Sequence, residues 1–151
     1  MIKIMTSTKS KFLAQFLAGT LGGTVLGITG FINLLNYGGN HGCWPVINQL
    51  FNGVGYESCG PFGAIGGILI GFIFGILIIS KLKNQDYSKI SQVLGLCFLM
   101  PFFYVIIMFW PPFGDDDVGF ASTAVLAFIL VSAIPSLLVT LAINWRKVFK
   151  R

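Results

Sequence analysis

Four long stretches of apolar residues alternate with short polar segments along the chain. They cover residues 12–35, 61–80, 90–110 and 120–145. Because an α-helix rises about 1.5 Å per residue, about 20 apolar residues cross the hydrocarbon core of a bilayer. The apolar residues follow one another without the alternation of a barrel strand, which favours helices. The pattern therefore predicts an all-α integral membrane protein, with four transmembrane helices in a single domain over residues 1–151.

The charged residues lie between these stretches, and their sign differs between the two sides. All ten Lys and Arg residues precede the first stretch, lie between the second and third, or follow the fourth. The two remaining loops, 36–60 and 111–119, contain no Lys or Arg and hold Glu57 and three aspartates. Short basic loops stay on the cytoplasmic side of a membrane. We therefore expect both termini on that side and the loops 36–60 and 111–119 on the other.

The N-terminus has a second interpretation, because a secretory signal peptide also places basic residues ahead of an apolar run. The run over residues 12–35 lacks a clear A-x-A cleavage site and is long for a signal peptide. We therefore favour a first transmembrane helix.

The composition excludes whole classes of protein. Hydrophobic residues make up 55% of the chain and charged residues only 10%, whereas a soluble domain has about a quarter charged residues. Fifteen Phe residues are incompatible with disorder. The net charge of +5 comes from short clusters beside the membrane, so it indicates topology rather than nucleic-acid binding. We expect the lipid bilayer as the surroundings, in a bacterial inner membrane or a related organelle membrane.

The predicted spans contain no Asp, Glu, Lys, Arg or His. Ion-coupled transport, proton relay and intramembrane catalysis all need such groups within the membrane, and a haem needs axial ligands. The single histidine, His41, lies in a Gly-rich loop and is expected to be solvated rather than a metal ligand. No sequence motif of a nucleotide, zinc or hydrolase site is present. We expect neither an enzyme nor a bound cofactor or metal.

The loop 36–60 contains two cysteines, Cys43 and Cys59, on the side where disulfides persist. We predict a Cys43–Cys59 disulfide, and the alternative is a pair of free, buried thiols. Cys97 lies within the third span and is expected to be a small packing residue.

Between these cysteines, residues 45–51 predict a short helix on the membrane surface, started by Trp44 and Pro45. Its expected apolar face consists of Val46, Ile47, Leu50 and Phe51. The loop serves either as a binding surface for a partner or as a plug that closes the ends of the first two helices. Three consecutive aspartates in the loop 111–119 form either a solvated turn or a contact for Ca²⁺ or a basic partner. The residues expected to contact a partner are Tyr37, Trp44, Phe51, Tyr56, Glu57, Asp115, Asp116 and Asp117.

Glycines recur at every fourth position in the first two spans. They are Gly19, Gly23 and Gly27 in the first span, and Gly63, Gly67, Gly71 and Gly75 in the second. Steps of four place them along one helix face, where another backbone can approach closely. They predict a tight hairpin of the two helices, with contact to another subunit or self-association as the alternative or additional use.

A polar stripe follows the same step in the fourth span: Ser132, Ser136, Thr140 and Asn144. Such a stripe either packs against a neighbouring helix or lines a narrow polar path. Pro101 and Pro135 are expected to kink the third and fourth helices.

Two functions fit these features. The first is an auxiliary subunit or assembly factor of a larger membrane complex, which docks through the glycine-lined faces and the loop 36–60. The alternative is a homo-oligomeric channel or passive facilitator, in which the polar stripe lines the path and the acidic outer mouth favours cations.

Overall fold

The computed structural model describes residues 2–82, 85–109 and 115–149, and the side chains of residues 8–82, 85–98 and 123–145. Within these residues the chain is almost entirely helical and contains no strand, as the apolar pattern predicts. The helices are α1 (Ile2–His41), α2 (Pro45–Phe51), α3 (Tyr56–Lys81), α4 (Tyr87–Phe109) and α5 (Asp115–Phe149).

Three helices of the described part are long and apolar enough to cross a membrane. These segments are Thr8–His41, Tyr56–Lys81 and Thr123–Trp145, which belong to α1, α3 and α5. Large aliphatic side chains such as Ile70 and Ile78 of α3 are more than half exposed. That much exposed aliphatic surface is expected where the solvent is lipid rather than water. The structure is therefore that of an all-helical membrane protein.

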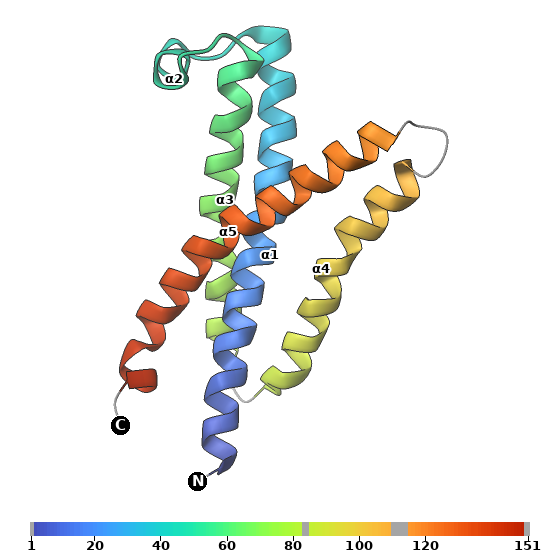
Figure 1. The fold of residues 1–151 in the computed structure, drawn as a ribbon. Helices are drawn as coiled ribbons and strands as arrows, with labels where there is room; N and C mark the ends of the chain where they lie inside the picture. The colour runs from blue at the N-terminus through green and yellow to red at the C-terminus, as the bar shows by residue number, and fades with distance from the viewer. Residues whose placement is uncertain (1, 83–84, 110–114, 150–151) are drawn as a thin grey trace.

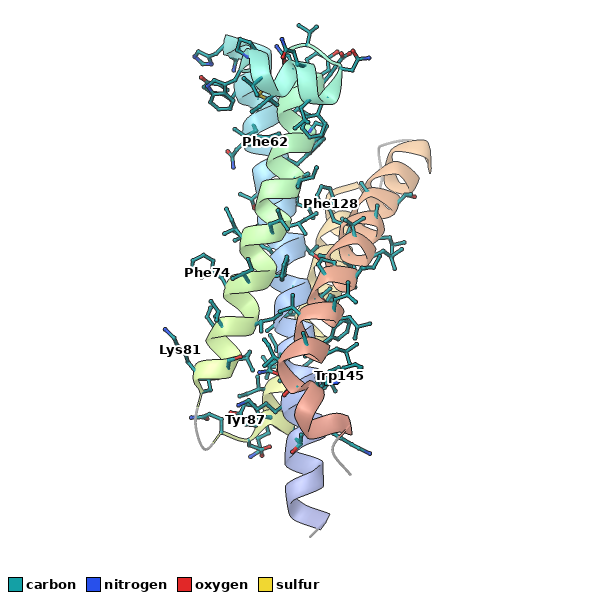
Figure 2. All side chains as sticks on the ribbon, turned by 90° about the vertical axis from the view of Figure 1, so that its left-hand side faces the viewer. Phe62, Phe74, Lys81, Tyr87, Phe128 and Trp145 are labelled. Atoms are coloured by element: carbon teal, nitrogen blue, oxygen red, sulfur yellow. A yellow bond between two sulfur atoms is a disulfide. The ribbon has the colours of Figure 1, made fainter. Side chains whose placement is uncertain are left out.

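The helices form a tight pair and a looser pair (Figure 1). α1 and α3 run side by side in opposite directions, while α5 crosses them at an angle and α4 lies beside α5. The start of α1 and the end of α5 point to the same end of the molecule, and α2 lies at the opposite end. α4 begins where Tyr87 is buried beside Ala14 and Ile79, which attaches it to α1 and α3 at the end of the molecule opposite α2 (Figure 2).

The helices extend beyond the predicted apolar spans, so the expected loop 36–60 is too long at both ends. α1 continues to His41 and ends where Gly42 adopts a φ of 75°. α3 begins at Tyr56, after Gly55 with a φ of 57°. The prediction was wrong because an apolar run indicates the depth of the membrane, whereas helical hydrogen bonds continue into polar residues outside it.

The expected loop 111–119 is also corrected, because α5 already starts at Asp115. Aspartates in a first helical turn are favourable, since the amino end of a helix carries a partial positive charge. The side chains of Asp115, Asp116 and Asp117 lie outside the described residues. Pro135 lies within α5 and Pro101 within α4, and both helices continue through them.

Candidate functional site

The end of the molecule that carries α2 is a compact unit, the cap, which comprises residues 37–59. A disulfide joins Cys43, just after α1, to Cys59 in the first turn of α3, with a Cα–Cα distance of 5.6 Å. This confirms the predicted pairing. Gly38 of α1 lies against the carbonyl of Gly55, which brings the ends of the two long helices together within the cap.

The short helix expected between the cysteines is present as α2. Pro45 occupies its first turn, where the missing N–H of proline costs no hydrogen bond. Asn52 ends it with a φ of 50° and a backbone N–H that donates to the carbonyl of Asn48. The Asn48 amide in turn donates to the carbonyl of Cys43, at 3.3 Å. α2 is therefore held at both ends.

The apolar residues of α2 do not share one face, which corrects the expectation from the sequence. Ile47 and Phe51 are half-buried, whereas Val46 and Leu50 are 75% and 73% exposed. Val54, in the turn that follows, is exposed to a similar extent. α2 packs against α3, so the half-buried pair lies toward the hairpin and the other pair points away from it.

Aromatic rings cover another side of the cap. Tyr37 stacks on His41 at 4.9 Å between ring centroids and on Trp44 at 5.3 Å. Tyr56 and Glu57 are exposed in the first turn of α3. Of the residues proposed to contact a partner, those in the cap are thus gathered at one end of the molecule, with Phe51 only half-exposed.

The four glycines of the α3 repeat all face the backbone of α1. A Cβ atom on any of them would lie 2.0–2.2 Å from a carbonyl oxygen of α1, far inside van der Waals distance. The pairs are Gly63 with Gly30, Gly67 with Leu26, Gly71 with Gly22, and Gly75 with Ala18. Absence of side chains is thus what allows the two backbones to touch.

The glycines of the α1 repeat lie where α1 meets both α3 and α5. Cβ atoms on Gly19 and Gly23 would collide with Ser136 and Ser132 of α5, and one on Gly27 would collide with Ile68 of α3. Gly22 and Gly30, which the sequence argument missed, face the backbone of α3 most directly. Gly22 and Gly30 are eight residues apart, with Leu26 halfway between them, and this spacing could have predicted that they share one helix face. α1 therefore carries two small-residue stripes on adjacent faces.

The polar stripe of α5 is buried against α1, and we call this contact the polar seam. Ser132, Ser136 and Thr140 are fully buried and Asn144 nearly so. The Ser136 hydroxyl donates to the backbone carbonyl of Phe16 at 2.9 Å. The hydroxyls of Ser132 and Thr24 lie 2.9 Å apart, and either can donate.

At the end of the polar seam opposite the cap, side-chain hydrogen bonds link two amides and a hydroxyl. Asn144 donates to the Oε1 atom of Gln15 at 2.8 Å, and the Gln15 amide donates to the hydroxyl of Ser80 at 2.9 Å. Three helices, α5, α1 and α3, are thus joined by two hydrogen bonds. The sequence argument also missed Gln15, an amide in an apolar run, and the pair Thr20 and Thr24 at a helical step.

The burial of the polar seam bears on its chemical use. Its hydroxyls and amide contact α1, and in the described part the stripe faces a helix rather than open space.

Cys97 of α4 is exposed rather than packed within the chain, which corrects its expected role. No group of three or more His, Cys, Asp or Glu side chains comes together among the described residues.

No family model, curated protein or solved structure matches this chain.

Proposed function

We propose that the chain is a non-catalytic auxiliary subunit or assembly factor, whose cap binds the extracytoplasmic face of a partner membrane protein. The observation that carries the proposal is the exposed apolar surface of the cap. Val46, Leu50 and Val54 are each about three-quarters exposed outside the apolar span of α3. Leaving such side chains in water costs about 1.5–3 kcal/mol each relative to burial, which favours a covered state.

The cap has the properties of a preformed binding surface. Its disulfide, the two ends of α2 and the stacking of Tyr37 with Trp44 restrict its conformations. A rigid surface loses little conformational freedom on binding, which raises affinity. Exposed aromatic rings beside aliphatic side chains match the composition at the centre of protein interfaces.

The position of the cap favours a partner that is itself embedded in the membrane. Cys59 lies only two residues, or about 3 Å along the helix, before Pro61, where the apolar span of α3 begins, and the disulfide ties Cys43, two residues before α2, to this point. α2 projects to the side of α3 that faces away from α4 (Figure 1). A partner seated on Val46 and Leu50 would thus stand beside α3, close to the membrane surface.

The proposed topology has four spans, with α4 as the third, and both termini in the cytoplasm. The distribution of the ten basic residues supports this orientation. The disulfide supports it independently, because disulfides persist on the extracytoplasmic side. The proposed location is a bacterial inner membrane or a related organelle membrane.

The cap replaces the glycine stripes as the proposed docking surface. Gly63, Gly67, Gly71 and Gly75 are in contact with α1, so their close-approach face is used within the chain. The polar seam is likewise taken up by α1, and this removes the main support for a channel in which Ser132 and Ser136 line the path.

Native mass spectrometry of the C-terminally tagged protein, extracted gently from its own membrane, tests the proposal. The expected spectrum contains a second polypeptide in fixed ratio to the chain of 16.4 kDa. The double variant Val46→Asn and Leu50→Asn removes the exposed aliphatic side chains and should lower recovery of the partner at least about tenfold. Gln49→Asn, which changes an exposed polar residue of the same helix, should leave recovery unchanged.

Two results would contradict the proposal. Recovery of the chain alone under gentle extraction would show that it has no stable partner. A closed ring of identical chains would favour the homo-oligomeric channel, and flux measurements in liposomes would follow.

A further inference from the structure

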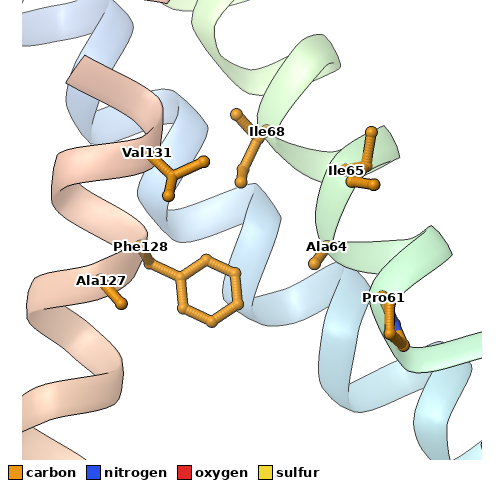
Figure 3. A pocket seen from close by; sticks show the side chains of 7 residues that line it. All are labelled: Pro61, Ala64, Ile65, Ile68, Ala127, Phe128 and Val131. Atoms are coloured by element: carbon orange, nitrogen blue, oxygen red, sulfur yellow. The ribbon is translucent and has the colours of Figure 1, made fainter. Parts of the chain in front are cut away.

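An apolar cleft lies between α3 and α5 in the part of the membrane-crossing region nearer the cap (Figure 3). Its volume is about 260 Å³, and its described lining contributes only apolar surface. The lining residues are Pro61, Ala64, Ile65 and Ile68 of α3, and Ala127, Phe128 and Val131 of α5. Ile65 and Val131 are about half exposed, so the cleft opens to the lipid-facing surface.

The cleft exists because α5 crosses the hairpin and diverges from α3 toward the end that carries the cap (Figure 1). Phe128 stands opposite Ala64 across the gap (Figure 3). Its ring is held by Phe31 of α1 in an edge-to-face contact with centroids 6.1 Å apart. Gly27 of α1 lies against both Ile68 and Phe128, so α1 lies behind the cleft, on the side away from the lipid. Three helices thus build one fixed cavity wall.

The size of the cleft decides what can fill it. From Pro61 to Ile68 the cleft extends over seven residues of α3, or about 10 Å along the helix. That length is less than two helical turns, whereas a transmembrane helix of a partner would follow the surface over about 20 residues. The cleft is therefore a short apolar recess in the lipid-facing surface, which suits a hydrocarbon chain.

We infer that this cleft is a binding site for one acyl chain of a membrane lipid. The lining offers dispersion contacts from two helices and no hydrogen-bonding group from its described side chains, which matches a hydrocarbon chain and disfavours a polar solute. The cleft opens onto the lipid-facing surface of the protein, so the acyl chain enters sideways from the bilayer. The small side chains of Ala64 and Ala127 provide the room.

Photo-crosslinking in nanodiscs tests this site. The probe is a phosphatidylglycerol whose acyl chain carries a mid-chain diazirine, diluted into phosphatidylethanolamine. After irradiation, peptide mass spectrometry locates the adducts on the full-length protein. Adducts are expected to concentrate on the cleft residues of α3 and α5, well above exposed positions elsewhere on α3 such as Ile70 and Ile78. Adducts spread evenly over all exposed apolar residues would show an ordinary lipid annulus and overturn the inference.

Two filling variants provide the second arm. Ala64→Leu and Ala127→Leu place a larger side chain in the cleft and should reduce adducts there about tenfold, since several chain contacts are lost. Ala142→Leu adds the same volume at an exposed position of α5 outside the cleft and should leave the adducts unchanged. Unchanged labelling in both filling variants would overturn the inference. An absence of cleft adducts in the wild type would show that a second copy or another protein covers the cleft, and it would overturn the inference as well.

Discussion

Gly71 of α3 and Gly22 of α1 face each other so closely that neither position has room for a methyl group. A Cβ on Gly71 would lie 2.0 Å from the carbonyl oxygen of Gly22, and a Cβ on Gly22 would lie 2.3 Å from that of Gly71. In lipid, apolar side chains gain little by leaving one hydrocarbon surface for another, so close packing drives helix association. The α1–α3 hairpin is therefore held by backbone contact.

Substitution of Gly71 tests this contact. Gly71→Ala forces the two backbones apart and should lower the free energy of unfolding by about 1–3 kcal/mol or more. Gly66→Ala, on the same helix, is the matched control, because no described atom lies within 4 Å of its Cβ. The control should be neutral or slightly stabilising. Thermal denaturation in a mild detergent measures both, and equal melting temperatures for the two variants would show that the contact is unimportant.

The polar seam predicts opposite effects for two neighbouring positions. Asn144→Leu removes the hydrogen bond to Gln15 and leaves a buried amide oxygen without it, which should destabilise the fold by about 1–3 kcal/mol. The hydroxyl of Thr140 is fully buried and finds no partner among the described residues. Thr140→Val should therefore be neutral or stabilising. Chemical denaturation in detergent compares the two, and a destabilised Thr140→Val would show that its hydroxyl is satisfied.

Thiol labelling checks the disulfide of the cap. Of the three cysteines, Cys43 and Cys59 are paired and Cys97 is free. Protein denatured without reductant should take up one maleimide per chain, and reduced protein three. Cys43→Ser should lower the melting temperature, since a closed loop of this length contributes about 3 kcal/mol in the chain-entropy model. Cys97→Ser should not change it, and uptake of three maleimides before reduction would exclude the disulfide.

Reporter fusions test the proposed orientation. A fluorescent protein at the C-terminus should fold and fluoresce in the cytoplasm, whereas a fused periplasmic phosphatase at that end should stay inactive. A short epitope inserted after Gln49 should be accessible from outside intact spheroplasts. The reverse result would show that the proposed orientation is wrong. The cap would then lie in a reducing compartment, where its disulfide would be unstable.

Much of the architecture could be predicted because each property depends on neighbouring residues along the chain. The apolar runs predict the helices, and the cysteines on the non-basic side predict the bridge. The cap itself was less predictable. Whether Ile47 and Phe51 or Val46 and Leu50 face the hairpin depends on how α2 is anchored between Cys43 and Asn52, and the apolar pattern of a seven-residue helix does not specify that.

The class of the protein, its helices and its stripes of small and polar residues follow from composition and from a period of four along one helix. Which stripe meets which helix depends on tertiary contacts. α1 carries small residues on two adjacent faces, so Gly22 and Gly30 face the backbone of α3, while Gly19 and Gly23 lie against Ser136 and Ser132 of α5 as well as against α3. The cleft likewise depends on the angle at which α5 crosses the hairpin. A crossing angle is set by contacts among residues far apart in the chain, so no local pattern contains it.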